Sequence, residues 1–413
     1  MNIYLGLTIL ICLSAGFAYL NQRFLKLPFV IGLFILSTIL SILLITSKLW
    51  LDIPIDKIET YIEIANIDKI ILNILLGFLL FAGALHTNWN SLKKQRRPIA
   101  TFAVGGVLLS TITIAALFYG LTQLFHLQIS FVYCLIFGAL ISPTDPIAVL
   151  GILTKANVPK KTEYIIVGES LFNDGVGVVV FIALLDTLKT GSFSYSHFSF
   201  LFFQEAVGGI AMGLIFGYFL YLLLKSVDHY ETEILLTLAF VMAGYGMFNY
   251  IHISGALAMV VMGLIVGNFR KDISMSDTTQ EYVHKFWELF DVILNAVLFI
   301  LIAFVLIVIE FKTKYILVGI ISVFIVLLSR IIIVYLPHLI FPKLLKLTNK
   351  EAKIISWGGL RGGLSLALVL SLPNNETKNI LLIATYFCVL FSIIIQGLTI
   401  EKLAKQGVDN ANL

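Results

Sequence analysis

Long apolar runs separated by short polar connections follow one another along the whole chain. A membrane-spanning helix needs about 20 consecutive, mostly apolar residues. Thirteen segments approach this requirement: residues 3–20, 29–46, 70–84, 99–124, 130–153, 164–188, 200–224, 234–251, 254–268, 286–309, 315–340, 353–372 and 379–403. The pattern predicts an all-α polytopic membrane protein of about 13 transmembrane helices, forming a single membrane unit. The eighth and ninth segments are separated only if Ile251, His252 and Ile253 make a turn.

The connections differ in their positive charge. Of the 28 Lys and Arg residues, 19 lie in loops on one side of this predicted topology and seven on the other. The remaining two, Arg330 and Arg361, lie inside spans. Because Lys and Arg accumulate in cytoplasmic loops, the bias predicts a multi-pass cell-membrane protein with its N-terminus outside and its C-terminus in the cytoplasm. The longest connection, residues 47–69, contains an amphipathic stretch at 58–64 that is predicted to lie at the membrane interface.

Composition agrees with a lipid environment. The 413 residues are 59% hydrophobic and 13% charged, whereas soluble domains carry about 25% charged residues. The net charge of +4 is spread over loops, so nucleic-acid binding is not expected. The three cysteines, Cys12, Cys134 and Cys388, lie in apolar runs without metal-ligand spacing, which predicts neither a disulfide nor a metal site. No cofactor is expected.

Five ionisable residues lie deep inside predicted spans: Asp145, Glu169, Asp174, Arg330 and Arg361. A charge at the centre of a membrane helix costs about 2.5–3.5 kcal/mol on insertion scales, so each needs a partner or a function. Their formal sum is −1, which suits one monovalent cation or one proton. Other charges, including Glu288 and Asp291, are assigned to the ends of spans.

The fifth span contains the sequence SPTDP at residues 142–146. Two prolines three positions apart remove two main-chain donors and disfavour helical geometry before them. The segment is therefore predicted to unwind, which frees carbonyl groups near Thr144 and Asp145 to bind a cation. The alternative is a kinked helix in which Asp145 caps the second half.

The sixth span contains GESLFNDG at residues 168–175. Residues four apart share a helix face, so Ser170 lies above Asp174 and Glu169 above Asn173. The first pair offers a hydroxyl and a carboxylate, which are oxygen ligands for a hard cation. The alternative is a buried polar network that only holds helices together.

The twelfth span contains WGGLRGGLS at residues 357–365, where four glycines surround Arg361. This predicts an interrupted helix with close main-chain approach; the alternative is a small-residue packing face with an Arg that reaches the interface. Spans five and twelve are seven apart, and an odd offset inverts topology. The layout predicts two inverted halves, spans 1–6 and 8–13, with interrupted helices 5 and 12 and span 7 as the linker.

Together these motifs resemble the NhaP-type sodium/proton antiporters of the monovalent cation:proton antiporter superfamily. The resemblance rests on TDP at 144–146, GES at 168–170 followed by NDG at 173–175, and GLRG at 359–362. It implies a homodimer with a dimerisation part at 1–90 and 230–310, and a linker helix at 200–225. It further implies an ion-translocating core at 98–190 and 315–404 that moves like an elevator.

The resemblance also implies residue roles. Asp174 is the expected transport carboxylate, and Ser170 with the main-chain carbonyl of Thr144 completes the cation shell. Asp145 is expected to pair with Asn173, and Arg330 with Glu169, whereas Arg361 lines the core near the site. Asn173 stands where electrogenic relatives carry a second Asp, which implies electroneutral exchange of one cation for one proton.

One position departs from the family pattern: Ala82 follows Phe81 where many relatives have an acidic residue. The expected activity is Na⁺(Li⁺)/H⁺ antiport in pH homeostasis, with K⁺/H⁺ antiport by the same fold as the alternative. Enzymatic activity is not expected: Asp145 and Asp174 could mimic an intramembrane aspartyl hydrolase, but Asn173 and Arg361 have no place in that chemistry. A channel is the remaining class, and saturable exchange would exclude it.

Overall fold

A computed structural model gives the structure of the chain and describes residues 3–47, 67–145, 153, 158–191, 194–268, 277–309 and 312–409. Every regular element in this part of the chain is a helix. The first half comprises α1 (Ile3–Leu20), η1 (Asn21–Leu25), α2 (Phe29–Ser47), α4 (Ile67–Ile70), η2 (Ile71–Leu75), α5 (Leu76–Leu85), α6 (Trp89–Lys94), α7 (Arg96–Ala100), η3 (Thr101–Gly106), α8 (Val107–Leu124), α9 (Phe131–Ile141) and α11 (Lys160–Thr190). The predicted interfacial stretch at 58–64 lies outside the described residues.

The second half begins with α12, the predicted linker helix. Its elements are α12 (Tyr195–Ser226), α13 (Tyr230–Tyr250), α14 (Gly255–Asn268), α15 (Asp277–Val308), α16 (Thr313–Ile340), α17 (Pro342–Leu345), α18 (Asn349–Trp357), α19 (Gly363–Leu370), α20 (Glu376–Phe391), η5 (Ser392–Gln396) and α21 (Gly397–Asp409). The predicted turn between the eighth and ninth spans is present: α13 ends at Tyr250, and His252 has a φ of 55° before α14 begins.

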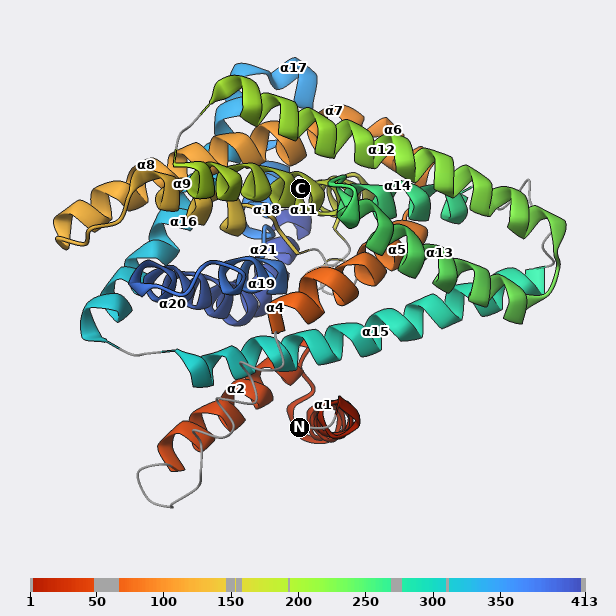
Figure 1. The fold of residues 1–413 in the computed structure, drawn as a ribbon, viewed down its shortest axis with the longest axis horizontal. Coiled ribbons are helices and arrows are strands. Elements are labelled where there is room, and N and C mark those ends of the chain that lie inside the picture. The colour runs from red at the N-terminus through yellow and green to blue at the C-terminus, as the bar shows by residue number, and fades with distance from the viewer. Residues whose placement is uncertain are drawn as a thin grey trace.

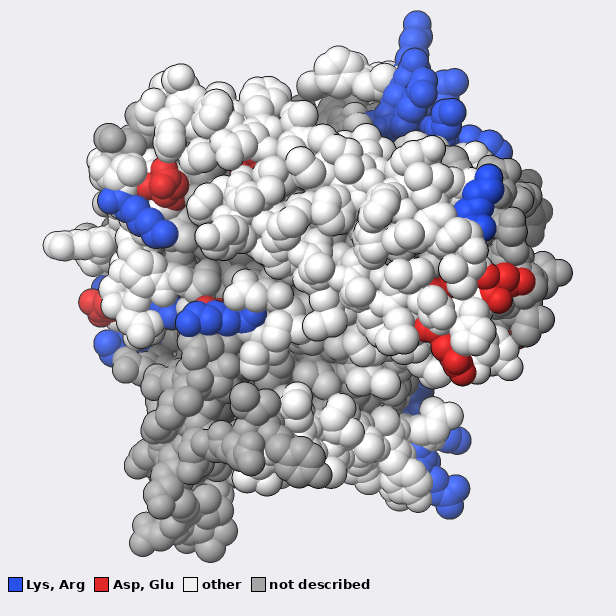
Figure 2. Space-filling model, turned by 45° about the vertical axis from the view of Figure 1, so that its right-hand side comes forward, with Lys and Arg blue, Asp and Glu red and all other residues white. Residues whose placement is uncertain are grey.

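Each of the thirteen predicted segments overlaps at least one of these helices. Among the described residues, ten helices are long and apolar enough to cross a membrane, and α9 and α14 are shorter apolar helices. The chain is therefore a multi-pass membrane protein, while the count of thirteen crossings stays a prediction. On the face drawn in Figure 2, charged side chains gather towards the edges and leave a broad uncharged expanse between them. Such an expanse suits a surface in contact with lipid.

The long helix α15 runs across the molecule, with other helices packed on both of its sides (Figure 1). On one side of it lie α1 and α2, and on the other lie α5 and α19. Other helices pack on one another in pairs: α8 and α11 each pack on α9, and α16 packs on α20. The predicted linker helix α12 packs closely on α14, with its Gly213 against the main chain of Ala258.

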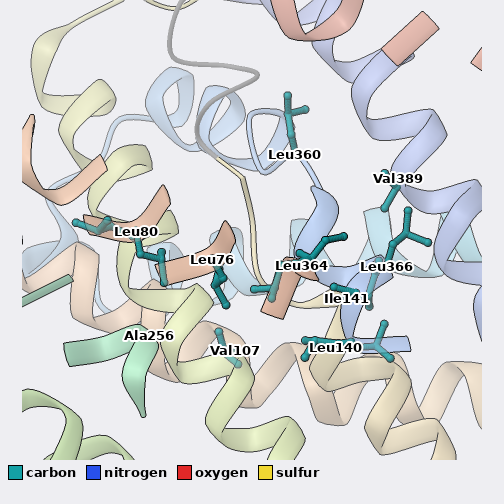
Figure 3. Packing of buried hydrophobic residues seen from close by; sticks show 14 of the residues in the cluster. Leu76, Leu80, Val107, Leu140, Ile141, Ala256, Leu360, Leu364, Leu366 and Val389 are labelled. Carbon is teal, nitrogen blue, oxygen red and sulfur yellow. The ribbon is translucent and has the colours of Figure 1, made fainter. Parts of the chain in front are cut away.

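The apolar core continues between the helices that surround the interrupted segments. Figure 3 shows Leu364 and Leu366 of α19 near Leu140 and Ile141 of α9. Leu366, Leu140 and Ile141 are fully buried. This packing holds two short helices in place although neither is long enough to be stable alone. The non-helical segments next to them are therefore surrounded by a packed apolar core.

Candidate functional site

Two helices end inside predicted spans, and the segments that follow them cross. After α9 ends at Ile141, the described residues 142–145 are not helical; residues 358–362 separate α18 from α19. The main-chain N–H of Asp145 donates to the carbonyl of Leu360 at 2.8 Å. Helix ends leave main-chain groups without intrahelical partners, and this bond gives one main-chain group of each segment a hydrogen-bond partner in the other segment.

The crossing is close because one segment carries glycine at the contact. A Cβ atom at Gly362 would collide with the carboxylate of Asp145 and would lie 2.7 Å from its Cβ atom. Only glycine can occupy this position without displacing Asp145. On the other segment, Pro143 removes a main-chain donor, so α9 cannot continue with regular bonding. Pro146 lies outside the described residues.

Thr144, Ser170 and Asn173 form a buried network between the fifth-span segment and α11. The Thr144 and Ser170 hydroxyl oxygens lie 2.9 Å apart. Asn173 donates from Nδ2 to Thr144 Oγ1 at 2.8 Å and accepts the Thr144 N–H at its Oδ1 at 3.3 Å. The network fixes Thr144 against α11. Both of these Asn173 bonds go to Thr144, and the expected pairing of Asn173 with Asp145 stays a prediction.

Asp174 lies far from either end of α11. Fourteen residues separate it from the first residue, Lys160, which corresponds to roughly 21 Å at 1.5 Å per residue. It is close enough to Asp145 for the two carboxylates to interact electrostatically. Ser170 and Asp174 both line a cavity of about 650 Å³, as the shared helix face predicted, together with Thr144 and Asp145.

The cavity lies between two groups of helices and is acidic. One wall comes from α5 and α15, and the other from α11, α19 and the segment after α9. Its titratable lining residues are His86, Asp145, Glu163, Tyr164, Asp174, Glu288 and Asp291. Five are carboxylates, and no Lys or Arg stands among the described residues that line it. A cleft lined by one sign of charge concentrates ions of the other, here cations.

The predicted pair of Arg330 and Glu169 is present in the structure. The guanidinium of Arg330 makes a bidentate salt bridge, in which its Nη2 lies 2.9 Å from Glu169 Oε2. The same nitrogen donates to the carbonyl of Ile355 at 3.0 Å, which ties α16 to both α11 and α18. The two side chains are buried, with exposed fractions of 6% and 2%. Glu169 is thus committed to a structural ion pair, whereas Asp174 forms no salt bridge within the part of the chain that the structure describes.

Arg361 is bound to main-chain carbonyls near the end of α9. Its Nη1 donates to the carbonyls of Ser142 and Pro143, the latter at 3.1 Å. A cation there complements the partial negative charge of a helix C-terminus. The Arg361 N–H donates to Ser392 Oγ at 2.8 Å, and Ser392 in turn donates to Gln396 Oε1 at 2.6 Å. Sequence reasoning missed Ser392 and Gln396, because isolated polar residues in a span carry no motif.

One expectation about the lining changes. Asp291 does not sit at the end of its helix: α15 already begins at Asp277, so Asp291 lies about four turns inside α15 and lines the cavity. The apolar run from 286 concealed this, because the first turns of α15 are polar. Ala82 is fully buried, and the α5 residues in the lining are Leu76, Leu79, Leu80 and Gly83.

Comparison with known proteins identifies the family of this chain. The family model described as sodium/hydrogen exchanger, transmembrane, matches residues 9–406. The chain belongs to the sodium/hydrogen exchanger family. Among its relatives in that family, the Na(+)/H(+) antiporter NhaP of Pseudomonas aeruginosa is 42% identical over 404 residues, covering 96% of this chain and 95% of that protein. The NhaH antiporter of Halobacillus dabanensis is 32% identical over 413 residues, covering 98% of each.

The exchanger fold is also supported by a solved structure. The sodium proton antiporter MjNhaP1 from Methanocaldococcus jannaschii aligns with a TM-score of 0.77 at 21% identity, covering 97% of each chain. At this identity the likeness establishes the fold alone. The fold expected from the motif resemblance is therefore confirmed.

Proposed function

We propose that this exchanger-family chain is an Na⁺/H⁺ antiporter in which Asp174 binds either Na⁺ (or Li⁺) or a proton. The observation that carries the proposal is the placement of Asp174: a carboxylate deep within α11 lines an acidic cavity beside two crossed non-helical segments. The two relatives described above, NhaP and NhaH, match this chain over nearly its full length and are antiporters by name. Asp174, the Ser170 hydroxyl and the Thr144 main-chain carbonyl together provide oxygen ligands, which hard cations prefer.

Competition for one carboxylate couples the two ions. Removal from water disfavours the charged form of a carboxyl group, so a buried carboxyl without a cation holds a proton more readily than one in water. When Na⁺ occupies the site it replaces that proton, and when the proton returns it displaces Na⁺. The core moves the site from one side of the membrane to the other when either ion is bound. It does not move while Asp174 is empty and charged, because that charge would be uncompensated.

Exchange is electroneutral in this proposal. The charges predicted to lie deep inside the spans of the core are Asp145, Glu169, Asp174, Arg330 and Arg361, with a formal sum of −1. One Na⁺ or one proton therefore neutralises the core equally. Asn173 supports this count, because it fills the position next to Asp174 with a neutral group that bonds to Thr144.

The division into scaffold and core belongs to the same proposal. Residues 1–90 and 230–310 form the scaffold and dimer-forming part, residues 98–190 and 315–404 form the core, and residues 200–225 link them. The cavity supports this division because α5 and α15 form one wall and core elements form the other. In addition, α1 buries little of its surface within the chain, as a helix in a dimer interface or in lipid would. With the N-terminus outside, the cavity faces the cytoplasm.

The test is ion exchange by purified protein in liposomes that contain a pH-sensitive dye. Wild type should alkalinise or acidify the lumen in response to Na⁺ or Li⁺ gradients, and Asp174→Asn should abolish the response. Asp186→Asn is the matched control, because Asp186 lies three turns farther along α11 and pairs with His197 at 2.9 Å. Wild-type exchange in Asp174→Asn would contradict the proposal. A response to K⁺ that exceeds the response to Na⁺ would replace it with K⁺/H⁺ antiport.

A further inference from the structure

Helix α15 brings to the cavity a carboxylate that the exchange at Asp174 does not use. Asp291 lies on α15, which belongs to the scaffold side, and lines the same cavity as Asp145 and Asp174. It is close enough to Asp145 for the two carboxylates to interact electrostatically. Added to the five ionisable residues predicted deep inside spans, Asp291 brings their formal charge from −1 to −2, so one cation at Asp174 leaves one negative charge of this set without compensation.

The packing of α15 fixes where Asp291 points relative to the crossing. Two turns after Asp291, the side chain of Leu298 packs against Gly363, where a Cβ atom would lie 2.8 Å from Leu298 Cδ1. Gly363 directly follows Gly362, which contacts the carboxylate of Asp145. Hence the face of α15 that bears Asp291 abuts the start of α19, next to the crossed segments.

A second oxygen stands one turn behind Asp291. Asn295 is 1% exposed, and its Nδ2 donates to the main-chain carbonyl of Asp291 at 2.9 Å. This bond orients the amide, and its buried Oδ1 has no hydrogen-bond partner among the described residues. Asn295 is not itself one of the residues that line the cavity; it shares a helix face with Asp291, which does line it. The amide also interacts with the Asp291 carboxylate. A buried carbonyl oxygen without a partner costs about 1–3 kcal/mol, so it marks a place where a donor or a cation belongs.

Asp291 and Asn295 on α15 repeat the arrangement of Asp174 and Ser170 on α11. Each helix offers a carboxylate and a neutral oxygen four residues away, which share a face. We propose that Asp291 and Asn295 form a second binding position for a monovalent alkali cation, on the scaffold wall of the cavity. A cation bound at this position lies close to the core but stays with the scaffold when the core moves. From there the cation is transferred to Asp174.

The assignment rests on the proposed function, and it adds a feature that Asp174 alone does not provide. Since Asp291 stays with the scaffold, a cation bound there does not cross the membrane, and one-for-one exchange by the core is retained. An empty and charged Asp291 repels the Asp145 carboxylate when the cavity is open. Binding a cation at Asp291 relieves this repulsion and raises the local concentration of the ion.

The experiment measures binding of ²²Na⁺ to purified protein in detergent, in a background that lacks the transport carboxylate. Asp174→Asn should still bind about one Na⁺ per chain saturably, and adding Asp291→Asn should weaken this binding at least about tenfold. One unit charge roughly 10 Å away at an effective dielectric constant of about 25 would contribute about tenfold, so a carboxylate in contact with the cation should contribute at least this much. At an exposed position, where the effective dielectric constant is about 80, the same charge contributes only about twofold. Adding Asn295→Ala should weaken it severalfold, while Asp291→Glu, which keeps the charge, should retain binding.

Glu288→Gln in the Asp174→Asn background is the matched control, because Glu288 lies on the same helix and lines the same cavity but is exposed. It should leave the residual binding within about twofold. Absence of residual binding in Asp174→Asn, or residual binding that Asp291→Asn leaves unchanged, would overturn the inference. Equal losses in Glu288→Gln and Asp291→Asn would also overturn it, since they would indicate a diffuse acidic surface. Wild-type exchange by Asp174→Asn, by contrast, would refute the proposed function.

Discussion

The buried ion pair of Arg330 and Glu169 gives the sharpest prediction about stability. Removing one partner leaves an uncompensated buried charge, and breaking such pairs destabilises proteins by about 3–5 kcal/mol. Both side chains are nearly inaccessible, and the bidentate geometry with the third bond to Ile355 indicates the upper part of this range. Glu169→Gln and Arg330→Met should each be destabilising by about this amount. Removing both partners leaves no buried charge, so the double variant should be more stable than the sum of the two single losses.

The magnitude can be converted to a melting temperature. At about 2.1 cal/mol/K per residue, a chain of 413 residues has an unfolding entropy of about 0.9 kcal/mol/K. A loss of about 3–5 kcal/mol then lowers the midpoint by about 3–6 °C. The assay is thermal unfolding of purified single and double variants in one detergent, followed by intrinsic fluorescence. The matched control pair is Lys405→Met and Glu401→Gln, an exposed pair at 2.6 Å that should contribute about 1 kcal/mol or less.

A coupling energy of at least about 2 kcal/mol between Glu169 and Arg330 is expected from the double-mutant cycle. Additive effects of the two substitutions would refute the reasoning. So would a single variant as stable as the wild type, because it would mean that water or another charge compensates the remaining partner.

Three further predictions concern the crossing and the coupling of ions. Gly362→Ala should abolish exchange and lower the melting temperature, because its Cβ collides with Asp145; Gly105→Ala, with open space around it, is the control, and normal exchange by Gly362→Ala would contradict the geometry. Ser392→Ala leaves the Arg361 N–H without its acceptor and should be destabilising by about 1–3 kcal/mol in thermal unfolding; an unchanged midpoint would speak against that bond. In exchange assays the apparent Na⁺ affinity should fall as pH falls, since protons compete for Asp174, and an affinity independent of pH would exclude competition.

Much of the fold follows from the sequence because a membrane restricts the possible answers. Helices are the only open-chain structures that satisfy their main-chain groups in lipid, so apolar runs translate directly into helices. The turn at His252 and the break at the glycine-rich segment around Arg361 followed from local chemistry. Helix ends were less predictable: the polar first turns of α15 concealed the depth of Asp291, because hydropathy does not register a helix that continues beyond its apolar part.

The candidate site was predictable where one helix sets the geometry and less so where helices meet. Ser170 and Asp174 share a face of α11, and that relation needs only the helical period. The link from Arg361 to Ser392 joins residues 31 positions apart and depends on how the twelfth and thirteenth spans pack. The acceptors of the Arg361 side chain are main-chain carbonyls, which leave no trace in the residue types. Contacts of this kind are visible only in the assembled structure.

The central claim is that Na⁺ and a proton exclude each other at Asp174. Its most direct test adds NaCl to purified protein in weakly buffered detergent solution and follows a pH indicator, with choline chloride as the ionic-strength control. We predict that Na⁺ releases protons from the wild type, up to one per chain, and that Asp174→Asn releases none. Absence of release from the wild type, or undiminished release from Asp174→Asn, would contradict the account.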